Sequence, residues 1–581
     1  MKRVALDFET HYTGEYSVKK LGHALYARDP RFRCTMAAAW SPTLKVSTTP
    51  DRFPWDALDG AEIVAHNAAF DRAVFRRLQS DGIVPACIKP KIWLDSAAAC
   101  AYFGLPRSLD GAVKALFGVT LDKSIRGRMS GNQLDLFDDV AAYAASDAEW
   151  AWKLWERLGD KWPAAEARIH ALTDEMGDRG VCIDLPAAKA ADAKLAAAIA
   201  GLEASLPFHP PGSMPALKQA CAERGQPIPP GTAAKDPAVD GWCIANQKAD
   251  SPLWVRQVQQ WRRVNRTREV VRSMLARVHP DTGRMQYELK YFGAGQTGRW
   301  SGGGGLNVQN FNRQAGEAGT DLRGLIVPAP GHAFIIADYA QIEARVLLWL
   351  AGDYDFLDLL RGGMDLYEAA ARKMLGYSDP RPIKEVDPGL RQLAKGMTLG
   401  LGFGMGAGKF VSAAKVLAGL DIEFDDCRRH VETYRQMNPL VVGFWRRQGD
   451  AFESKHGKPH YSPRLPSGRL IRYWEPLCDG DMTYAAEKGG TRYTGHPGLL
   501  AENMVQATAR DILADAWLRL DDAGYLPVLS VHDELVFEVP EEAAVHSKAE
   551  ITRIMQTPPP WPLADRLPLE VEARVANRYG K

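Results

Sequence analysis

Two aspartates that each follow a run of apolar residues are the first candidates for chemistry in this 581-residue chain. Asp338 lies in Ala-Asp-Tyr-Ala-Gln-Ile-Glu-Ala-Arg, and Asp533 lies in Ser-Val-His-Asp-Glu-Leu-Val-Phe-Glu-Val. Two carboxylates that a fold brings together can bind a pair of divalent cations, and such a pair supports phosphoryl transfer. Taken alone, each is better explained as an ordinary surface carboxylate, so the interpretation depends on the surrounding residues.

The apolar residues around these aspartates predict the elements that carry them. Residues 334–337 predict a short strand and residues 342–350 a helix, so Asp338 is expected at a strand-to-helix junction. Residues 528–539 predict a hairpin with Asp533 at its tip. At both places the apolar residues would support the fold and leave the carboxylate accessible.

A third segment, residues 391–403, combines two cations with an aromatic side chain. Four residues advance an α-helix by about 40°, so Arg391, Lys395 and Leu399 share one face and Phe403 lies at its margin. Two cations beside an aromatic ring suit a nucleoside triphosphate, whereas the alternative for this segment alone is a solvated amphipathic helix. Its several glycines predict a mobile or kinked helix, since each lowers helix stability.

The N-terminal region carries a second set of acids. Asp7 and Glu9 are two residues apart on a predicted strand and so project from one face of it. Asp71 follows another apolar run, and Tyr143 and Asp147 are four apart in an alanine-rich helical stretch, where they share a face. Four acids with a tyrosine suit two-metal hydrolysis of a phosphodiester.

The first three segments together resemble the ordered motifs of family A DNA polymerases, the bacterial DNA polymerase I type. The matching residues are, in chain order, Asp338 with Glu343, Arg391 with Lys395 and Phe403, and His532 with Asp533. The chain departs from the family at Leu399, where an aromatic residue is usual. Selectivity for the 3′ position of the sugar is therefore not carried over from the family.

The resemblance implies a role for each matching residue. Asp338, Asp533 and the carbonyl of Tyr339 would bind metal. Arg391 and Lys395 would bind the triphosphate, with Lys395 as the proton donor to pyrophosphate. The remaining nucleotide contacts would come from Leu399, from Glu343, which excludes ribonucleotides, and from Phe403, which stacks near the nascent base pair.

Two further segments resemble the parts of this family that touch the primer-template duplex. Minor-groove contacts of this kind check the shape of a base pair without reading its sequence, which suits a copying enzyme. The expected DNA-binding residues are Arg299, Asn307, Gln309, Asn503, Gln506 and His532.

The N-terminal acids resemble the three motifs of the DEDD exonuclease superfamily in its tyrosine-bearing variant. The resemblance implies a ribonuclease H-like domain in which two cations are held by Asp7, Glu9, Asp71 and Asp147, while Tyr143 orients the attacking water. Because all four acids are present, we expect an active 3′→5′ proofreading exonuclease.

A basic helical stretch at residues 261–279 could add phosphate contacts. The net charge of the chain is only +1, so any phosphate-binding surface must be local. Arg262 and Arg266 are the leading candidates, and four more arginines, the last of them Arg277, belong to the same stretch. A solvated helix face is the alternative interpretation.

These patterns predict a multidomain α/β and α+β protein, a ribonuclease H-like exonuclease followed by a right-hand polymerase. The expected division is exonuclease 1–160, thumb 161–280 with a mostly looped stretch at 206–237, palm 281–350, fingers 351–439 and palm 440–581. The resemblance implies two Mg²⁺ per active site, with Mn²⁺ as a possible substitute, and primer-template DNA and dNTPs as partners of a monomer.

Composition and length are consistent with this interpretation. The eight cysteines form no C-x-x-C pair, which favours a reducing compartment, and no leader or membrane segment is visible. We therefore expect a cytoplasmic protein of a bacterium or a phage-infected host, and the lack of a 5′-nuclease is typical of phage or prophage enzymes. The alternatives are a single-subunit RNA polymerase and a catalytically silent DNA-binding protein.

Overall fold

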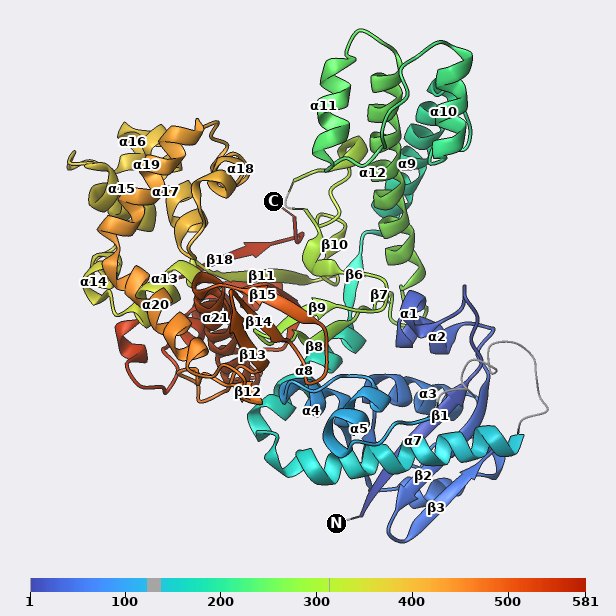
Figure 1. Ribbon diagram of the computed structural model, residues 1–581. Helices are drawn as coiled ribbons and strands as arrows, with labels where there is room; N and C mark the ends of the chain where they lie inside the picture. The colour runs from blue at the N-terminus through green and yellow to red at the C-terminus, as the bar shows by residue number, and fades with distance from the viewer. Residues whose placement is uncertain (1, 123–136, 313, 581) are drawn as a thin grey trace.

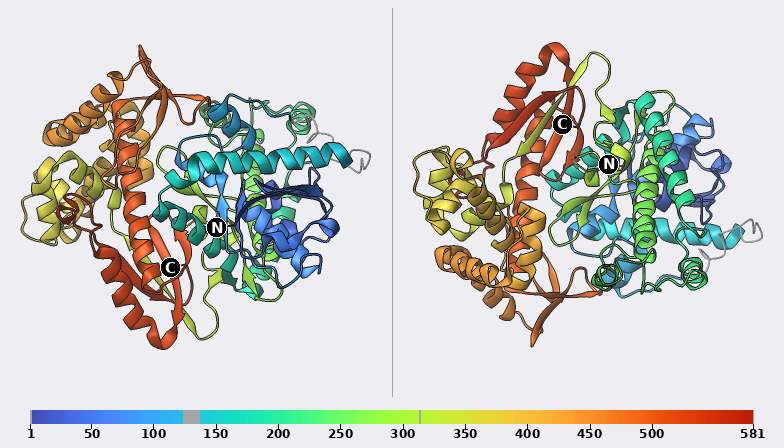
Figure 2. Two further views of the ribbon diagram at one scale, coloured as in Figure 1. Left: turned by 90° about the horizontal axis from the view of Figure 1, so that it is seen from below. Right: turned by 90° about the horizontal axis from the view of Figure 1, so that it is seen from above.

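The computed structural model describes residues 2–122, 137–312 and 314–580. In Figure 1 the N-terminal sheet and its helices lie at the bottom, while helices α9 to α12 project at the top. A central sheet near the middle is completed by the C-terminal residues, and a group of helices from α14 to α19 lies on its left. The two views in Figure 2 place those helices and the N-terminal part on opposite sides of the molecule.

The N-terminal part is built around a five-stranded sheet of order β3-β2-β1-β4-β5. Strands β1, β4 and β5 are parallel, and β2 and β3 pair antiparallel at the other edge. The strands are β1 (Arg3–Thr10), β2 (Cys34–Ser41), β3 (Leu44–Thr48), β4 (Glu62–Ala65) and β5 (Ile92–Asp95). The helices are α1 (Val18–Leu21), α2 (His23–Arg28), α3 (Ala68–Ser80), α4 (Ser96–Tyr102), α5 (Leu109–Phe117) and α7 (Phe137–Leu158).

The pairing of β1 with β2 decides which way the two acids of β1 point. Asp7 is paired with Ala38 and Glu9 with Met36. Paired residues of adjacent strands point to the same side of a sheet. Ala38 and Met36 pack against alanines of α7, so Asp7 and Glu9 lie on the face that α7 covers. The opposite face of β1 packs against α3.

The central sheet has the order β16-β17-β11-β18, and all neighbouring strands are antiparallel. Its strands are β11 (His332–Tyr339), β16 (Pro527–Val531), β17 (Glu534–Pro540) and β18 (Val571–Ala576). Helix α22 (Ala544–Gln556) packs on β11 and β18, and α21 (Pro497–Asp522) packs on α22 and α13 (Ile342–Ala351). The predicted strand, the helix after it and the hairpin are all confirmed.

The helices between β11 and the second half of the central sheet form a separate group. They are α14 (Tyr354–Arg361), α15 (Leu366–Leu375), α16 (Ile383–Val386), α17 (Pro388–Leu401), α18 (Ala407–Ala418) and α19 (Phe424–Met437), followed by α20 (Pro439–Glu453). A Cβ added at Gly396 would lie 3.2 Å from Ala418, and one at Gly400 would lie 3.0 Å from the ring of Phe410. These glycines therefore allow α18 to pack closely on α17. Helix α17 is continuous from Pro388 to Leu401, and the expected mobility or kink stays a prediction.

The projection at the top of Figure 1 is a pair of long helices with a small core at its end. Its helices are α9 (Leu185–Ser205), α10 (Met214–Glu223), α11 (Pro237–Ala245) and α12 (Ser251–Ala276), and α9 packs along α12. Leu217 of α10, Val239 of α11 and Trp254 of α12 belong to the core at the end. Residues 206–237 are mostly loop, as expected, but they include α10, which the side chain of Ser213 caps.

Shorter strands connect these parts. One small sheet has the order β10-β6-β7, a second pairs β8 with β9, and a third has the order β12-β13-β14-β15. Their bounds are β6 (Val181–Ile183), β7 (Arg284–Met285), β8 (Leu289–Ala294), β9 (Arg299–Gly302), β10 (Ile326–Val327), β12 (His460–Tyr461), β13 (Tyr473–Asp479), β14 (Asp481–Ala485) and β15 (Arg492–Gly495). Among the residues that the structure describes, no helix has the length and apolar character needed to cross a membrane.

A half-buried histidine joins the N-terminal part to the rest of the chain. The Nδ1 atom of His23, on α2, lies 2.8 Å from Oε1 of Glu288, and its Nε2 atom lies 3.5 Å from Oδ1 of Asp178. Burial alone would lower the pKa of His23, but the two carboxylates outweigh it and raise the pKa to about 10. The protonated imidazole is therefore part of the contact at neutral pH.

Replacing His23 by Gln should lower the melting temperature more at pH 6.5 than at pH 10. A raised folded-state pKa gives a stabilisation that is full below the unfolded value of about 6.5 and is lost as pH rises through the folded value. The measurement is thermal unfolding of both proteins across this range, with His546→Gln, at an exposed position, as the control. A difference that stays constant with pH would contradict the assignment.

Candidate active sites

Three of the four N-terminal acids form a cluster that could hold a metal ion. Carboxylate oxygens of Asp7 and Glu9 on β1 and of Asp147 on α7 all lie within 4.8 Å of one another. The cluster lines a cavity of about 610 Å³, to which Tyr143, one turn before Asp147, also contributes. Sheet pairing and the four-residue spacing on α7 thus bring together residues from distant parts of the sequence.

Asp71, in the first turn of α3, is not among the acids whose oxygens lie within 4.8 Å of one another. It is 1% exposed, and burial, Asp95 and Glu9 together raise the pKa of its carboxyl well above the usual value. Its Oδ1 atom is buried and has no hydrogen-bond partner. A buried carboxylate oxygen without a hydrogen-bond donor, influenced by Glu9 of the cluster, is the kind of ligand that suits a hard divalent cation.

The second acidic site lies on the central sheet. Asp338 is on β11, and Asp533 is in the turn between β16 and β17, where the backbone N–H of Tyr339 donates to its carbonyl at 3.2 Å. Burial raises the pKa of Asp533 to about 7; Arg299 opposes this shift, and Glu343 and Asp338 add to it. The Tyr339 phenol donates to the carbonyl of Met555 and is buried away from the acids.

A guanidinium lies among these acids. Arg299, on β9, forms an ion pair with Glu343 of α13, and its Nη2 atom is 3.8 Å from Oδ1 of Asp533. One positive charge thus offsets part of the repulsion between the carboxylates. The structure therefore gathers Arg299, Glu343, Asp338 and Asp533 into one site, and the expected contact of Arg299 with DNA stays a prediction.

The cationic helix is α17, as predicted from residues 391–403, but it ends at Leu401, so Phe403 lies in the turn that follows. Lys395 is half-buried, and the side chain of Leu399 is 37% exposed, which leaves it accessible to a ligand. Arg391 is fixed by Asp365, at 2.8 Å, and its guanidinium lies 5.0 Å from the centre of the Tyr367 ring.

Sequence reasoning missed Asp365 and Tyr367. Asp365 directly precedes α15, and Tyr367 is the second residue of that helix. The only local signal is that Asp365 caps α15 by accepting from the N–H groups of Tyr367 and Glu368. Their contact with Arg391 depends on how α15 packs against α17. The sequence spacing does not show this.

The amides expected at the primer-template are partly engaged within the protein. Asn307 accepts from the backbone N–H of Gln309 at 3.0 Å, and Gln309 is itself 7% exposed. On α21, the amide of Asn503 donates to the Tyr473 hydroxyl at 3.1 Å, and that of Gln506 donates to Glu502 at 3.1 Å. Their contacts with DNA stay a prediction.

The backbone at the hairpin tip adopts an uncommon conformation. His532 has a φ of 56°, in the left-handed region, immediately before Asp533. Glu534, after it, points inward and accepts from the hydroxyl of Tyr579 at 2.7 Å. The turn therefore directs the two acids differently, with Glu534 in the interior.

The basic stretch on α12 is only partly available for phosphate binding. Arg262 and Arg266 are exposed, and Arg262 donates to the carbonyl of Thr232 at 3.0 Å. Arg277 is 4% exposed and donates to the carbonyl of Leu21 at 2.6 Å. Its expected place on a phosphate-binding face is wrong, because it connects α12 to the N-terminal part.

An antiparallel sheet that carries two acids, a helix that carries two cations, and a separate nuclease-like acid cluster are the features of a polynucleotide polymerase with an attached hydrolytic site. The DNA polymerase family A profile matches residues 232–581, and a 3′-5′ exonuclease profile matches residues 54–162. The chain belongs to DNA polymerase family A. The predicted fold class, and a DNA-directed DNA polymerase with a 3′→5′ exonuclease, are confirmed.

Individual relatives are also DNA polymerases. The chain is 27% identical to the DNA polymerase of Bacillus phage SP02 over 100% of both sequences. It is 28% identical to the thermostable DNA polymerase I of Thermus aquaticus, over 73% of this chain and 49% of that protein. It is 32% identical to the enzyme of Thermus filiformis, over 56% of this chain and 36% of that protein.

One solved structure is similar over nearly the whole chain. The POL domain of Pol1 from M. smegmatis, in complex with a DNA primer-template and dNTP, has a TM-score of 0.68 and 20% identity. The similarity covers 99% of this chain and 95% of that one. At this identity the structural similarity supports the fold alone. Enzymes of the two matched families depend on metal ions.

The contact that fixes Arg391 leads to a prediction. Asp365→Asn should raise the KM for dNTP about tenfold and change kcat little, because a charge-assisted hydrogen bond worth roughly 1.5–3 kcal/mol no longer holds the guanidinium in place. Single-nucleotide extension at varied dNTP concentration measures this. Asp358→Asn, an exposed position on the neighbouring α14, is the matched control, and an equal rise in both variants would contradict the role.

Proposed function

We propose that Asp338 and Asp533 are the metal-binding acids of template-directed DNA synthesis. The observation that carries this is their convergence: neighbouring strands place them at one end of the central sheet, and burial with Glu343 and Asp338 nearby raises the pKa of Asp533 to about 7. Repulsion between these buried carboxylates favours binding of a divalent cation. The carbonyl of Tyr339 is a further candidate ligand. We propose two Mg²⁺ ions, for which Mn²⁺ can substitute.

The residues of α17 would hold the incoming nucleotide. Arg391, already oriented by Asp365, and Lys395, one turn further along the same face, would bind the triphosphate. Lys395 would donate a proton to the pyrophosphate leaving group, and Glu343 would crowd the 2′ position of the sugar. When bound, the two cations would neutralise phosphate charge and stabilise the attacking and leaving oxygens.

The N-terminal cluster would remove mismatched 3′ ends. Asp7, Glu9 and Asp147 supply oxygens close enough for one metal site, and Asp71, whose buried Oδ1 has no hydrogen-bond partner, would be the fourth metal-binding acid. Tyr143 lines the same cavity and would orient the attacking water. The likeness of residues 54–162 to 3′-5′ exonucleases supports this assignment.

The remaining roles follow the expected division of the chain. Residues 1–160 would be the exonuclease, 161–280 the thumb, 281–350 and 440–581 the palm, and 351–439 the fingers. Primer-template DNA would contact Asn307, Gln309, Asn503, Gln506 and His532, with Arg262 and Arg266 nearer the thumb. The phage relative, matched over 100% of both sequences, supports a replicative role in an infected bacterial cell. The protein would act there as a monomer.

Asp338→Asn should reduce primer extension at least 1,000-fold and leave degradation of a mismatched 3′ end within twofold of the parent. A metal-binding acid acts only at its own site, and neutralising it removes transition-state charge stabilisation worth about 4 kcal/mol. Extension and degradation of one labelled primer-template in Mg²⁺ measure both activities.

The reciprocal change is Asp7→Ala together with Glu9→Ala, which should abolish degradation of the mismatched end and leave extension intact. The two variants are controls for each other, because each keeps the activity that the other loses. Undiminished degradation by the double variant would refute the exonuclease assignment. Extension by Asp338→Asn at the parental rate would refute the polymerase assignment.

A further inference from the structure

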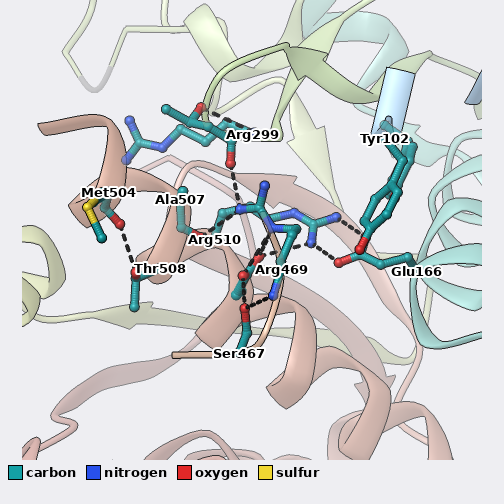
Figure 3. A network of polar contacts seen from close by, with 12 residues as sticks. Tyr102, Glu166, Arg299, Ser467, Arg469, Met504, Ala507, Thr508 and Arg510 are labelled. Atoms are coloured by element: carbon teal, nitrogen blue, oxygen red, sulfur yellow. Dashed lines mark hydrogen bonds and ion pairs between the residues drawn. The ribbon is translucent and has the colours of Figure 1, made fainter. Parts of the chain in front are cut away.

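Helix α8 (Ala164–Arg179) carries a row of polar side chains that reach both halves of the molecule. Glu166, His170, Asp174 and Asp178 follow one another at four-residue spacing and so lie along one side of the helix. At the start of this row Glu166 accepts from Arg510 of α21 at 2.6 and 2.9 Å, a contact drawn in Figure 3. The other three members contact the N-terminal part.

His170 contacts a carboxylate that organises the exonuclease site. Its Nε2 atom lies 3.4 Å from Oδ2 of Asp95, at the end of β5. Asp95 is 5% exposed, and its oxygens also accept from the backbone N–H groups of Asn67 at 3.2 Å and Ala68 at 3.0 Å. It further accepts from the first turn of α4. One carboxylate thus connects α8 to the start of α3.

The start of α3 is the part of the exonuclease domain that needs such support. Asn67 has a φ of 85°, in the left-handed region, where a residue other than glycine is strained. Asp71 lies in the first turn after it, and Asp95 is one of the groups that raise the pKa of its carboxyl. Two buried carboxylates stay close only if each is held in place.

A second contact joins α8 to α3 at Arg72, the residue directly after Asp71. The Nη2 atom of Arg72 lies 3.3 Å from Oδ2 of Asp174 and 3.2 Å from Oδ2 of Asp178. The side chains of Arg72 and Asp174 are only 13% and 12% exposed, so solvent screens the ion pair weakly. Helix α8 therefore holds both the backbone before Asp71 and the side chain after it.

We propose that His170 and Asp174 are positioning residues of the exonuclease site, so that a helix outside the expected exonuclease domain sets the metal affinity of that site. The proposal rests on the proposed role of Asp71 as a metal-binding acid. Groups that orient metal ligands from behind typically change metal affinity or activity by 10–100-fold when they are replaced. DNA synthesis uses other acids and should be unaffected.

The experiment separates the contact of His170 Nε2 with Asp95 from the packing of the imidazole ring. The imidazole ring lies 5.7 Å from the ring of Trp162 and 5.5 Å from that of Tyr291, both edge-on. His170→Phe keeps a ring in this place and removes the donor, whereas His170→Gln keeps a donor near the position of Nε2. Glu175→Gln, at an exposed position on the same helix, is the matched control.

The first readout is the Mn²⁺ concentration that gives half-maximal 3′→5′ degradation of a single-stranded oligonucleotide. The second readout is the dissociation constant of Mn²⁺ for the full chain, measured by electron paramagnetic resonance of the free ion. In this experiment every chain also carries Asp338→Asn and Asp533→Asn, which remove the other metal site. We expect His170→Phe to raise the half-maximal Mn²⁺ concentration and the Mn²⁺ dissociation constant about tenfold or more. Primer extension by this variant should stay within twofold of the parent. His170→Gln and Glu175→Gln should remain near the parent.

Asp174→Asn is the second variant, and it should shift the two Mn²⁺ values in the same direction. Unchanged values in His170→Phe, or an equal defect in His170→Gln, would overturn the proposal. Equal loss of extension and degradation in both His170→Phe and Asp174→Asn would also overturn it, because α8 would then serve folding alone. If Asp7→Ala with Glu9→Ala leaves degradation intact, the proposed site itself is wrong, a separate outcome.

Discussion

A guanidinium with no exposed surface connects the main parts of this polymerase. Arg510 of α21 is bound by Glu166 of α8 at 2.6 Å and lies 3.2 Å from Asp511, and Figure 3 shows it directed at Glu166. Three rings surround its plane, those of Tyr291, Phe292 and Trp300. Leaving a buried charge without its partner costs about 3–5 kcal/mol. Helices α8 and α21 and strands β8 and β9 are therefore held in one arrangement.

The two acidic sites show the opposite situation, in which like charges are kept together. Burial and neighbouring acids raise the pKa of Asp533 on the central sheet and of Asp71 in the N-terminal part. The turn between the paired strands β16 and β17 holds Asp533, and the first turn of α3 holds Asp71. Arg299 offsets part of the charge around Asp533. Stability elsewhere in the fold thus maintains two arrangements that favour divalent cations.

Much of the candidate chemistry could be predicted from local pattern. Two-residue alternation placed Asp7 and Glu9 on one face, and four-residue spacing placed Tyr143 and Asp147 together. The strand before Asp338 and the hairpin around Asp533 were equally visible. Local pattern did not predict the place of Arg277, the last arginine of the basic stretch. Its guanidinium is covered by Leu21 at the end of α1 and by Gly304 in the loop after β9, whose carbonyls it contacts. Local pattern predicted the mostly looped stretch at 206–237 but did not locate α10 within it.

The sequence by itself determined which acids, cations and aromatic residues are available and which of them share a strand face or a helix side, because periods of 2 and 3.6 residues are properties of the local backbone. Only the tertiary structure decided their partners. Asp365 meets Arg391, Asp95 meets His170, and Arg510 meets a glutamate 344 residues away. Such pairs depend on how whole helices and sheets pack, since burial makes each charge find a partner that sequence spacing does not specify.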